Sequence, residues 1–284
     1  MLWKAFLDES ETYDATNGGV RAYTVSCVLA PCRRWDDFDR AWAAAMDSCG
    51  AGGKIVHMRS LLHGPRGTEW EGWTEPERRR LFKELVRVIR SYPVVSYCGS
   101  IPMDAYEDLY AVTDEHDGRI SPYQLVLQGT MEAIIDGATA VNGGAASEGH
   151  PVHFYMEENR VTEADLTHQF LHLTRMRGWT EIFPSFTPIA KGPAALQLAD
   201  VVAYEGSTYA SRHELGSSTR PPRKLYHELS RTPGFVFSTA SRELLARHVM
   251  ELVRTRQRLG EADQEQINAC YEEARSEMQR QRCR

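Results

Sequence analysis

Residues 3–8, WKAFLD, are an apolar stretch that predicts a β-strand beginning almost at the first residue. A polar segment follows and ends in Asn17-Gly18-Gly19, a turn sequence typical of hairpins. Residues 20–30, VRAYTVSCVLA, are again rich in β-branched and aromatic side chains. Two such runs on either side of a turn predict an antiparallel hairpin at the start of the fold.

Helices and strands alternate irregularly after this hairpin. The apolar spacing predicts helices at 35–46, from Thr74 to just before Pro93, and at 121–141, 162–177 and 194–210, with strands at 94–101, 152–156 and 181–190. An antiparallel start followed by crossover helices predicts an α/β fold, in which a mixed sheet is flanked by helices.

The chain is expected to divide into a core and an appendage. We place the core at residues 1–210, and a loop followed by a C-terminal helical extension at 211–284. The extension is expected to hold helices at about 239–258 and 262–281. Their narrow apolar stripe predicts packing on the core or on a second copy of the chain, which would form a homo-oligomer.

Composition excludes several classes of protein. The 284 residues are 42% hydrophobic and 25% charged, as in ordinary globular proteins. No apolar run approaches the ~20 residues of a membrane span, and the first residues lack a signal-peptide pattern, so we expect a cytoplasmic protein without membrane contact. A net charge of −6 argues against a broad basic face that coats DNA. The glycine-rich phosphate-binding motifs of nucleotide-binding folds are absent.

Three carboxylates occupy unusual positions. Asp8 ends the first predicted strand, Glu157 ends another, and Asp200 lies inside an otherwise apolar helix. Carboxylates that converge on one point repel each other, and a divalent cation removes that repulsion. Their hard oxygen ligands suit Mg²⁺ or Mn²⁺. The alternative is that these acids cap helices or face solvent, with Asp200 paired to an arginine.

Two sequence motifs resemble a known family. The stretches FLDES at 6–10 and LQLADVVAY at 196–204 resemble the bacterial family catalogued as domain of unknown function 3800. KIVH at 54–57 is similar to that family's short motif ending in His, and YMEE at 155–158 lies where the family has an apolar strand ending in an acid, usually Asp. The resemblance spans residues 1 to about 210. It departs from the family at Glu11, where the family usually has Gly.

This resemblance implies a ribonuclease H-like fold of the retroviral integrase type, with acids on the first strand, the fourth strand and a late helix. The implied chemistry is metal-assisted hydrolysis of phosphodiester bonds in DNA or RNA. Asp8, Glu157 and Asp200 become metal ligands and catalytic residues. Glu9 and Glu158 are expected to point to the opposite strand face.

Further residues are expected near these acids. His57 is a candidate catalytic residue that polarises water or contacts phosphate. Lys191, just before a helix N-terminus, and Gln197, on the same helix face as Asp200, are expected to bind substrate. Two other functions remain open: a non-catalytic nucleic-acid- or partner-binding module of the same fold, and a metal-dependent hydrolase of a small phosphorylated or nucleotide substrate.

Overall fold

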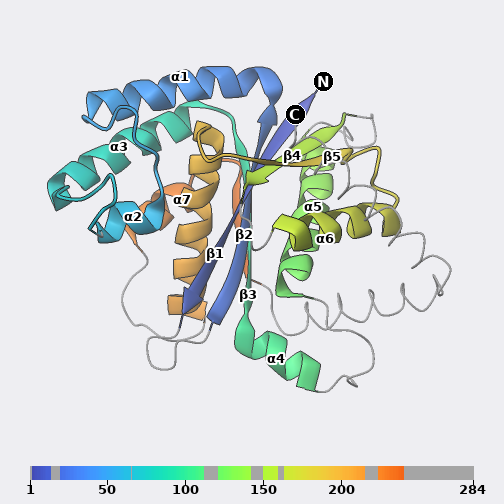
Figure 1. Ribbon diagram of the computed structural model, residues 1–284. Coiled ribbons are helices and arrows are strands. Elements are labelled where there is room, and N and C mark those ends of the chain that lie inside the picture. The colour runs from blue at the N-terminus through green and yellow to red at the C-terminus, as the bar shows by residue number, and fades with distance from the viewer. Residues whose placement is uncertain are drawn as a thin grey trace.

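The computed structural model describes residues 2–13, 20–64, 66–111, 121–141, 150–158, 163–214 and 223–239. Within these ranges a six-stranded sheet stands between two layers of helices (Figure 1). The strands are β1 (Trp3–Tyr13), β2 (Val20–Pro31), β3 (Val95–Pro102), β4 (Val152–Glu157), β5 (Ser185–Ile189) and β6 (Phe235–Thr239). The helices are α1 (Cys32–Ser48), α2 (Met58–His63), α3 (Glu75–Ser91), α4 (Met103–Ala111), α5 (Pro122–Val141), α6 (Glu163–Met176), α7 (Ala194–Tyr209) and α8 (Lys224–Ser230), with a π-helical turn at Ala210–Glu214.

The sheet is mixed, as the sequence predicts. Its strand order is β5-β4-β1-β2-β3-β6. Strands β1, β2 and β3 are antiparallel neighbours, whereas β4 is parallel to β1, β5 to β4, and β6 to β3. The α/β class and the N-terminal hairpin are therefore confirmed. Strand β6 comes from the segment after residue 210, so the sheet includes a strand beyond the expected core.

Strand β1 is longer than its apolar residues predict. It continues to Tyr13, so Asp8 lies within the strand and not at its end, which corrects the expectation. The reason is that antiparallel pairing with β2 continues through polar residues as far as Tyr13, paired with Val20. The parallel neighbour β4 ends at Glu157, so beyond Asp8 the strand has only β2 beside it.

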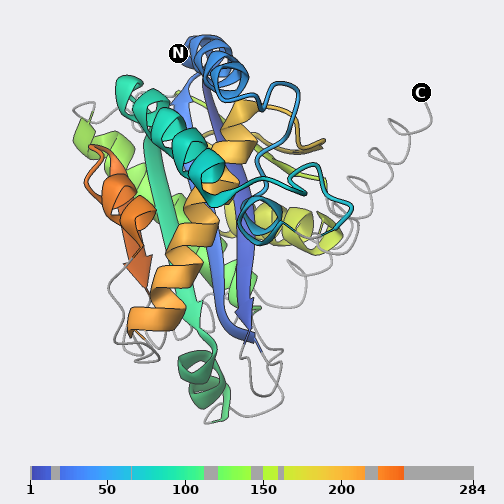
Figure 2. The same cartoon turned by 90° about the vertical axis from the view of Figure 1, so that its left-hand side faces the viewer.

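Two separate cores fix the two faces of the sheet. Strand alternation sends Phe6 to one face, under α1, α3 and α7, and Leu7 to the other face, under α5 and α6. Helix α7 packs on the first face, over β1, β2 and β3 (Figure 2). Asp8 is two residues after Phe6 in the same strand, so its side chain lies on the same face, the one covered by α7.

Some elements differ from the sequence expectations. Helices α2, α4 and α8 and strand β6 were not among the expected elements. All four are short, and short elements leave little periodic signal. The predicted C-terminal helices, and the association through them, lie outside the described residues except for Thr239, which is in β6. None of the helices within the described ranges is long and apolar enough to cross a membrane.

Candidate active site

The parallel pairing of β1 and β4 brings two of the acids together. Phe6 pairs with Tyr155 and Leu7 with Met156. The next step in the same register places Asp8 beside the last residue of β4, Glu157, on the α7 face. Strands β1 and β4 are neighbours inside the sheet, and the two carboxylates lie on the same face of it, with Asp8 inside its strand and Glu157 at the end of its own. Asp8 is buried, whereas the Glu157 side chain is 34% exposed.

Helix α7 supplies the third acid. Ser26 lies opposite Asp8 in the hairpin, and its hydroxyl donates a 2.7 Å hydrogen bond to the Ala199 carbonyl. This bond ties the helix to the sheet at the residue before Asp200. The Asp200 side chain is 9% exposed, and its Oδ2 accepts the Met58 backbone N–H at 2.6 Å. The three expected ligands are therefore brought to one place from three distant segments.

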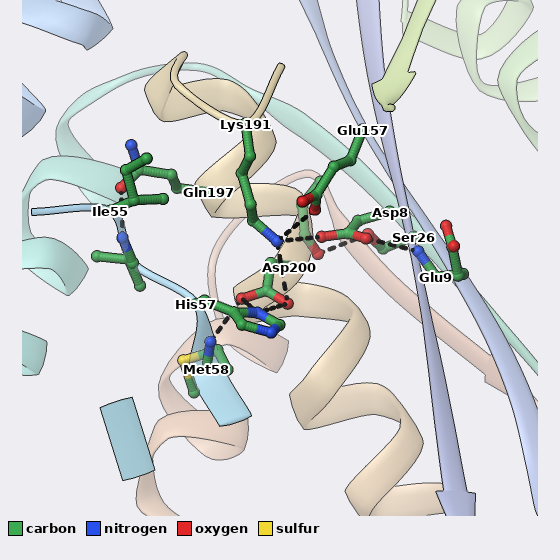
Figure 3. A network of polar contacts seen from close by, with 12 residues as sticks. Asp8, Glu9, Ser26, Ile55, His57, Met58, Glu157, Lys191, Gln197 and Asp200 are labelled. Carbon is green, nitrogen blue, oxygen red and sulfur yellow. Dashed lines mark hydrogen bonds and ion pairs between the residues drawn. The ribbon is translucent and has the colours of Figure 1, made fainter. Parts of the chain in front are cut away.

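A lysine lies at the centre of these acids. Lys191 Nζ is 2.7 Å from Glu157 Oε2, 3.2 Å from Asp8 Oδ2 and 3.6 Å from Asp200 Oδ1 (Figure 3). Its side chain is only 10% exposed, although it belongs to the loop between β5 and α7. Three carboxylates at −1 and one ammonium at +1 leave a formal charge of −2 in the cluster.

Burial and charge shift the ionisation of this cluster. Burial raises the pKa of Asp8 well above its ordinary value; the charge of Lys191 opposes this rise, and Asp200 adds to it. Burial lowers the pKa of Lys191, but the three carboxylates outweigh that effect and the net shift is upward. Lys191 therefore stays charged, while burial, with a smaller contribution from the neighbouring carboxylates, favours the neutral form of Asp8 and raises its pKa.

His57 borders the cluster on its solvent side. It is the N-cap residue of α2, and its side chain is 48% exposed. Nδ1 lies 3.3 Å from each carboxylate oxygen of Asp200. This contact leaves the opposite ring nitrogen, Nε2, to meet water or a phosphate.

Gln197 holds the neighbouring segments in place. Its Oε1 accepts the Val56 backbone N–H at 2.9 Å and the Trp42 indole N–H at 3.1 Å. Its Nε2 donates to the Gly192 carbonyl at 2.8 Å. These bonds fasten the segment before His57 and the loop after Lys191 onto α7, which gives Gln197 a positioning role. Its expected contact with substrate stays a prediction.

The acids that follow Asp8 and Glu157 in the chain, Glu9 and Glu158, lie away from the cluster. Glu9 is on the opposite side of β1 from Lys191, and its backbone N–H donates to Asp8 Oδ1 at 2.9 Å (Figure 3). Glu158 is exposed just past the end of β4. Strand alternation predicted this for Glu9.

Further residues extend the site along α7. The hydroxyl of Tyr204 is 3.4 Å from His63 Nε2, and the Arg223 guanidinium lies 5.4 Å from the centre of the Tyr204 ring. The shared helix face of Asp200 and Tyr204 was the available sequence signal. Nothing in the sequence placed Arg223, from the start of α8, beside that face.

The acids of the site are arranged around a lysine. Among the described residues, no group of three or more His, Cys, Asp and Glu side chains is arranged so that it could hold a metal ion. Instead, the acids surround an ammonium group. Comparisons of the chain with protein-family models, curated proteins and solved structures gave no match.

Proposed function

We propose that this protein is a divalent-metal-dependent nuclease of ribonuclease H-like fold that hydrolyses phosphodiester bonds of DNA or RNA. One observation carries the proposal: the carboxylates of Asp8, Glu157 and Asp200 all lie within 3.6 Å of one positively charged atom, Lys191 Nζ. They come from the first strand, the fourth strand and a late helix, which is the order that the motif resemblance implies.

The donor set fits a hard divalent cation. All three side chains offer carboxylate oxygens, the ligands that Mg²⁺ and Mn²⁺ prefer. The contacts of all three carboxylates with Lys191 Nζ support a cation position that they share. A bound Mg²⁺ or Mn²⁺ would supply Lewis-acid stabilisation of the phosphodiester and a water of lowered pKa.

The surrounding residues have separate tasks. Asp8, Glu157 and Asp200 would hold the ion. His57, half exposed and fixed through Nδ1, is the group placed to transfer a proton at Nε2. Lys191 lies among the acids and Arg223 lies over the Tyr204 ring of α7, and both side chains would be suited to bind the phosphates of the nucleic acid.

A non-catalytic nucleic-acid-binding module of the same fold is the second candidate. The observation that favours it is again Lys191, because its ammonium already supplies the acids with a positive charge. A site with a permanent lysine counter-ion has no need of a metal. The two candidates therefore differ in whether divalent ions bind and support cleavage.

The test is a cleavage assay on single- and double-stranded DNA and RNA in Mg²⁺ and Mn²⁺, comparing the parent with Asp8→Asn. Asparagine keeps the shape and removes the charge, so cleavage should fall to background. Glu9→Gln, the neighbouring acid on the opposite strand face, is the matched control and should retain activity. Full cleavage by a folded Asp8→Asn protein, or no cleavage of any substrate by the parent, would contradict the proposal and favour the binding module.

A further inference from the structure

The ammonium of Lys191 and a divalent ion compete for one position. A carboxylate binds an ammonium at about 2.7–2.9 Å, and it binds Mg²⁺ at about 2.0–2.1 Å. Lys191 Nζ is 2.7 Å from Glu157 and 3.2 Å from Asp8, so it occupies the space in which a metal would contact both acids. Two cations so close would also repel each other strongly in a buried site. The two states therefore exclude each other.

The side chain of Lys191 can leave without movement of its backbone. On one side, the Ile189 carbonyl accepts the Glu158 N–H at 2.8 Å, and on the other, the Gly192 carbonyl accepts Gln197 Nε2 at 2.8 Å. Between these anchors, the lysine is a flexible four-carbon stem with a charged end. Its neighbours Ala190 and Gly192 are exposed, so solvent lies beside the loop. Rotation about the side-chain bonds is enough to release it.

We propose that Lys191 is an exchangeable internal cation: its ammonium fills the metal position in the metal-free protein and moves to the entrance of the site when a divalent ion binds. This inference rests on the proposed metal site and adds the residue that controls its occupancy. In the metal-free form Lys191 offsets repulsion between the buried Asp8 and Asp200. After exchange, the freed ammonium lies near the half-buried Glu157, where it can bind a phosphate. The expected substrate contact of Lys191 then depends on metal binding.

The first experiment measures the accessibility of the ammonium directly. The parent protein is acetylated with an N-hydroxysuccinimide ester, with and without saturating Mg²⁺, and each lysine is quantified by mass spectrometry. Lys191 should react slowly without metal and on the order of tenfold faster with it, because a paired buried amine reacts far less than a solvated one. Lys4, on the same sheet and against the Tyr155 ring, is the internal control and should not change. Unchanged labelling of Lys191 while calorimetry detects bound Mg²⁺ would overturn the proposal.

The second experiment measures competition through affinity. Lys191→Met keeps the length of the side chain without its charge, and calorimetric titration with Mn²⁺ alone should give a Kd lower by on the order of tenfold or more. Lys4→Met is the matched control and should bind Mn²⁺ as the parent does. A folded Lys191→Met protein that binds Mn²⁺ no more tightly than the parent would contradict the exchange. If Lys191→Met fails to fold, the acetylation of Lys191 in the parent, with and without Mg²⁺, still tests the exchange.

Both readouts are independent of cleavage. A parent that releases Lys191 on binding metal but cuts no nucleic acid would support the exchange and contradict the nuclease. A parent that cuts nucleic acid while Lys191 stays protected would support the nuclease and contradict the exchange. A parent that binds neither Mg²⁺ nor Mn²⁺ would contradict both.

Discussion

Replacement of Glu205 by glutamine should stabilise the protein at alkaline pH and have little effect at acid pH. Glu205 lies on α7 with 1% of its surface exposed, and Arg223 Nη1 is 3.0 Å from its Oε1. Burial raises the pKa of this carboxyl from an ordinary 4.5 to about 7, although the charges of Arg223 and Arg212 partly oppose the rise. The folded protein therefore holds the proton more tightly than the unfolded chain does.

The sign and size follow from this difference in pKa. Below pH 4.5 the carboxyl is protonated in both the folded and the unfolded state. As the pH rises from 4.5 through 7, the unfolded chain ionises more readily than the folded protein, so the free energy of unfolding falls. Each tenfold change in a protonation constant corresponds to about 1.4 kcal/mol, so ionised Glu205 costs about 3 kcal/mol of folding stability at pH 8. Glutamine resembles the protonated acid and avoids that cost. Its advantage should grow from less than about 1 kcal/mol at pH 5 to about 3 kcal/mol at pH 8.

Urea unfolding of the parent and of Glu205→Gln between pH 5 and pH 8 measures this effect. The difference between their free energies of unfolding at each pH removes the contributions of all other titrating groups. Glu84→Gln, at a partly exposed glutamate paired with Arg87, is the control, and it should change the free energy of unfolding by no more than about 1 kcal/mol at either pH. An advantage of Glu205→Gln that does not depend on pH, or a parent that is the more stable protein at pH 8, would refute the reasoning.

Three further predictions concern the site. Gln197→Leu should lower the free energy of unfolding by about 1–3 kcal/mol per buried group left unpaired, here the Val56 N–H and the Trp42 indole; a loss below this range in urea unfolding would show that water replaces the amide. Asp200→Asn should abolish most of the rise in melting temperature that Mg²⁺ or Mn²⁺ gives the parent, and an unchanged rise would place the ion elsewhere. His57→Ala should slow cleavage by about 10²–10⁴-fold, less than Asp8→Asn does. Equal rates for His57→Ala and the parent would remove His57 from the mechanism.

Much of the fold was predictable because local signals agreed with tertiary structure. The capping box that opens α3 is present, with the Glu77 carboxylate accepting the Thr74 backbone N–H at 2.7 Å. The apolar runs predicted β1, β2 and β4, and the acids that follow those runs meet because parallel strands bring equivalent positions together. The end of β1 was not predictable from composition, since its polar half is held by pairing with β2.

The centre of the site was less predictable than its acids. Lys191 was expected to contact substrate from a loop, and only the tertiary position of that loop, between β5 and α7 in the chain, shows its ammonium among the carboxylates. Gln197 is similar, because its three partners are distant in sequence or lie in irregular backbone. Side chains on loops take their positions from tertiary contacts, which sequence spacing does not encode.

The acids and the cation of this site are held with different rigidity, and that difference has a functional consequence. Asp8 is held in β1, a strand of the hairpin, and Asp200 in the buried helix α7, which is hydrogen-bonded to the sheet through Ser26. Lys191 is fixed only at its backbone, while its charge is at the end of a flexible stem. Without Lys191 the three carboxylates carry a formal charge of −3, so a divalent ion offsets more of that charge than a monovalent ion does and should be favoured. Exchange of the cation then requires no rearrangement of the fold, and the occupancy of the site depends on the concentration of divalent ions.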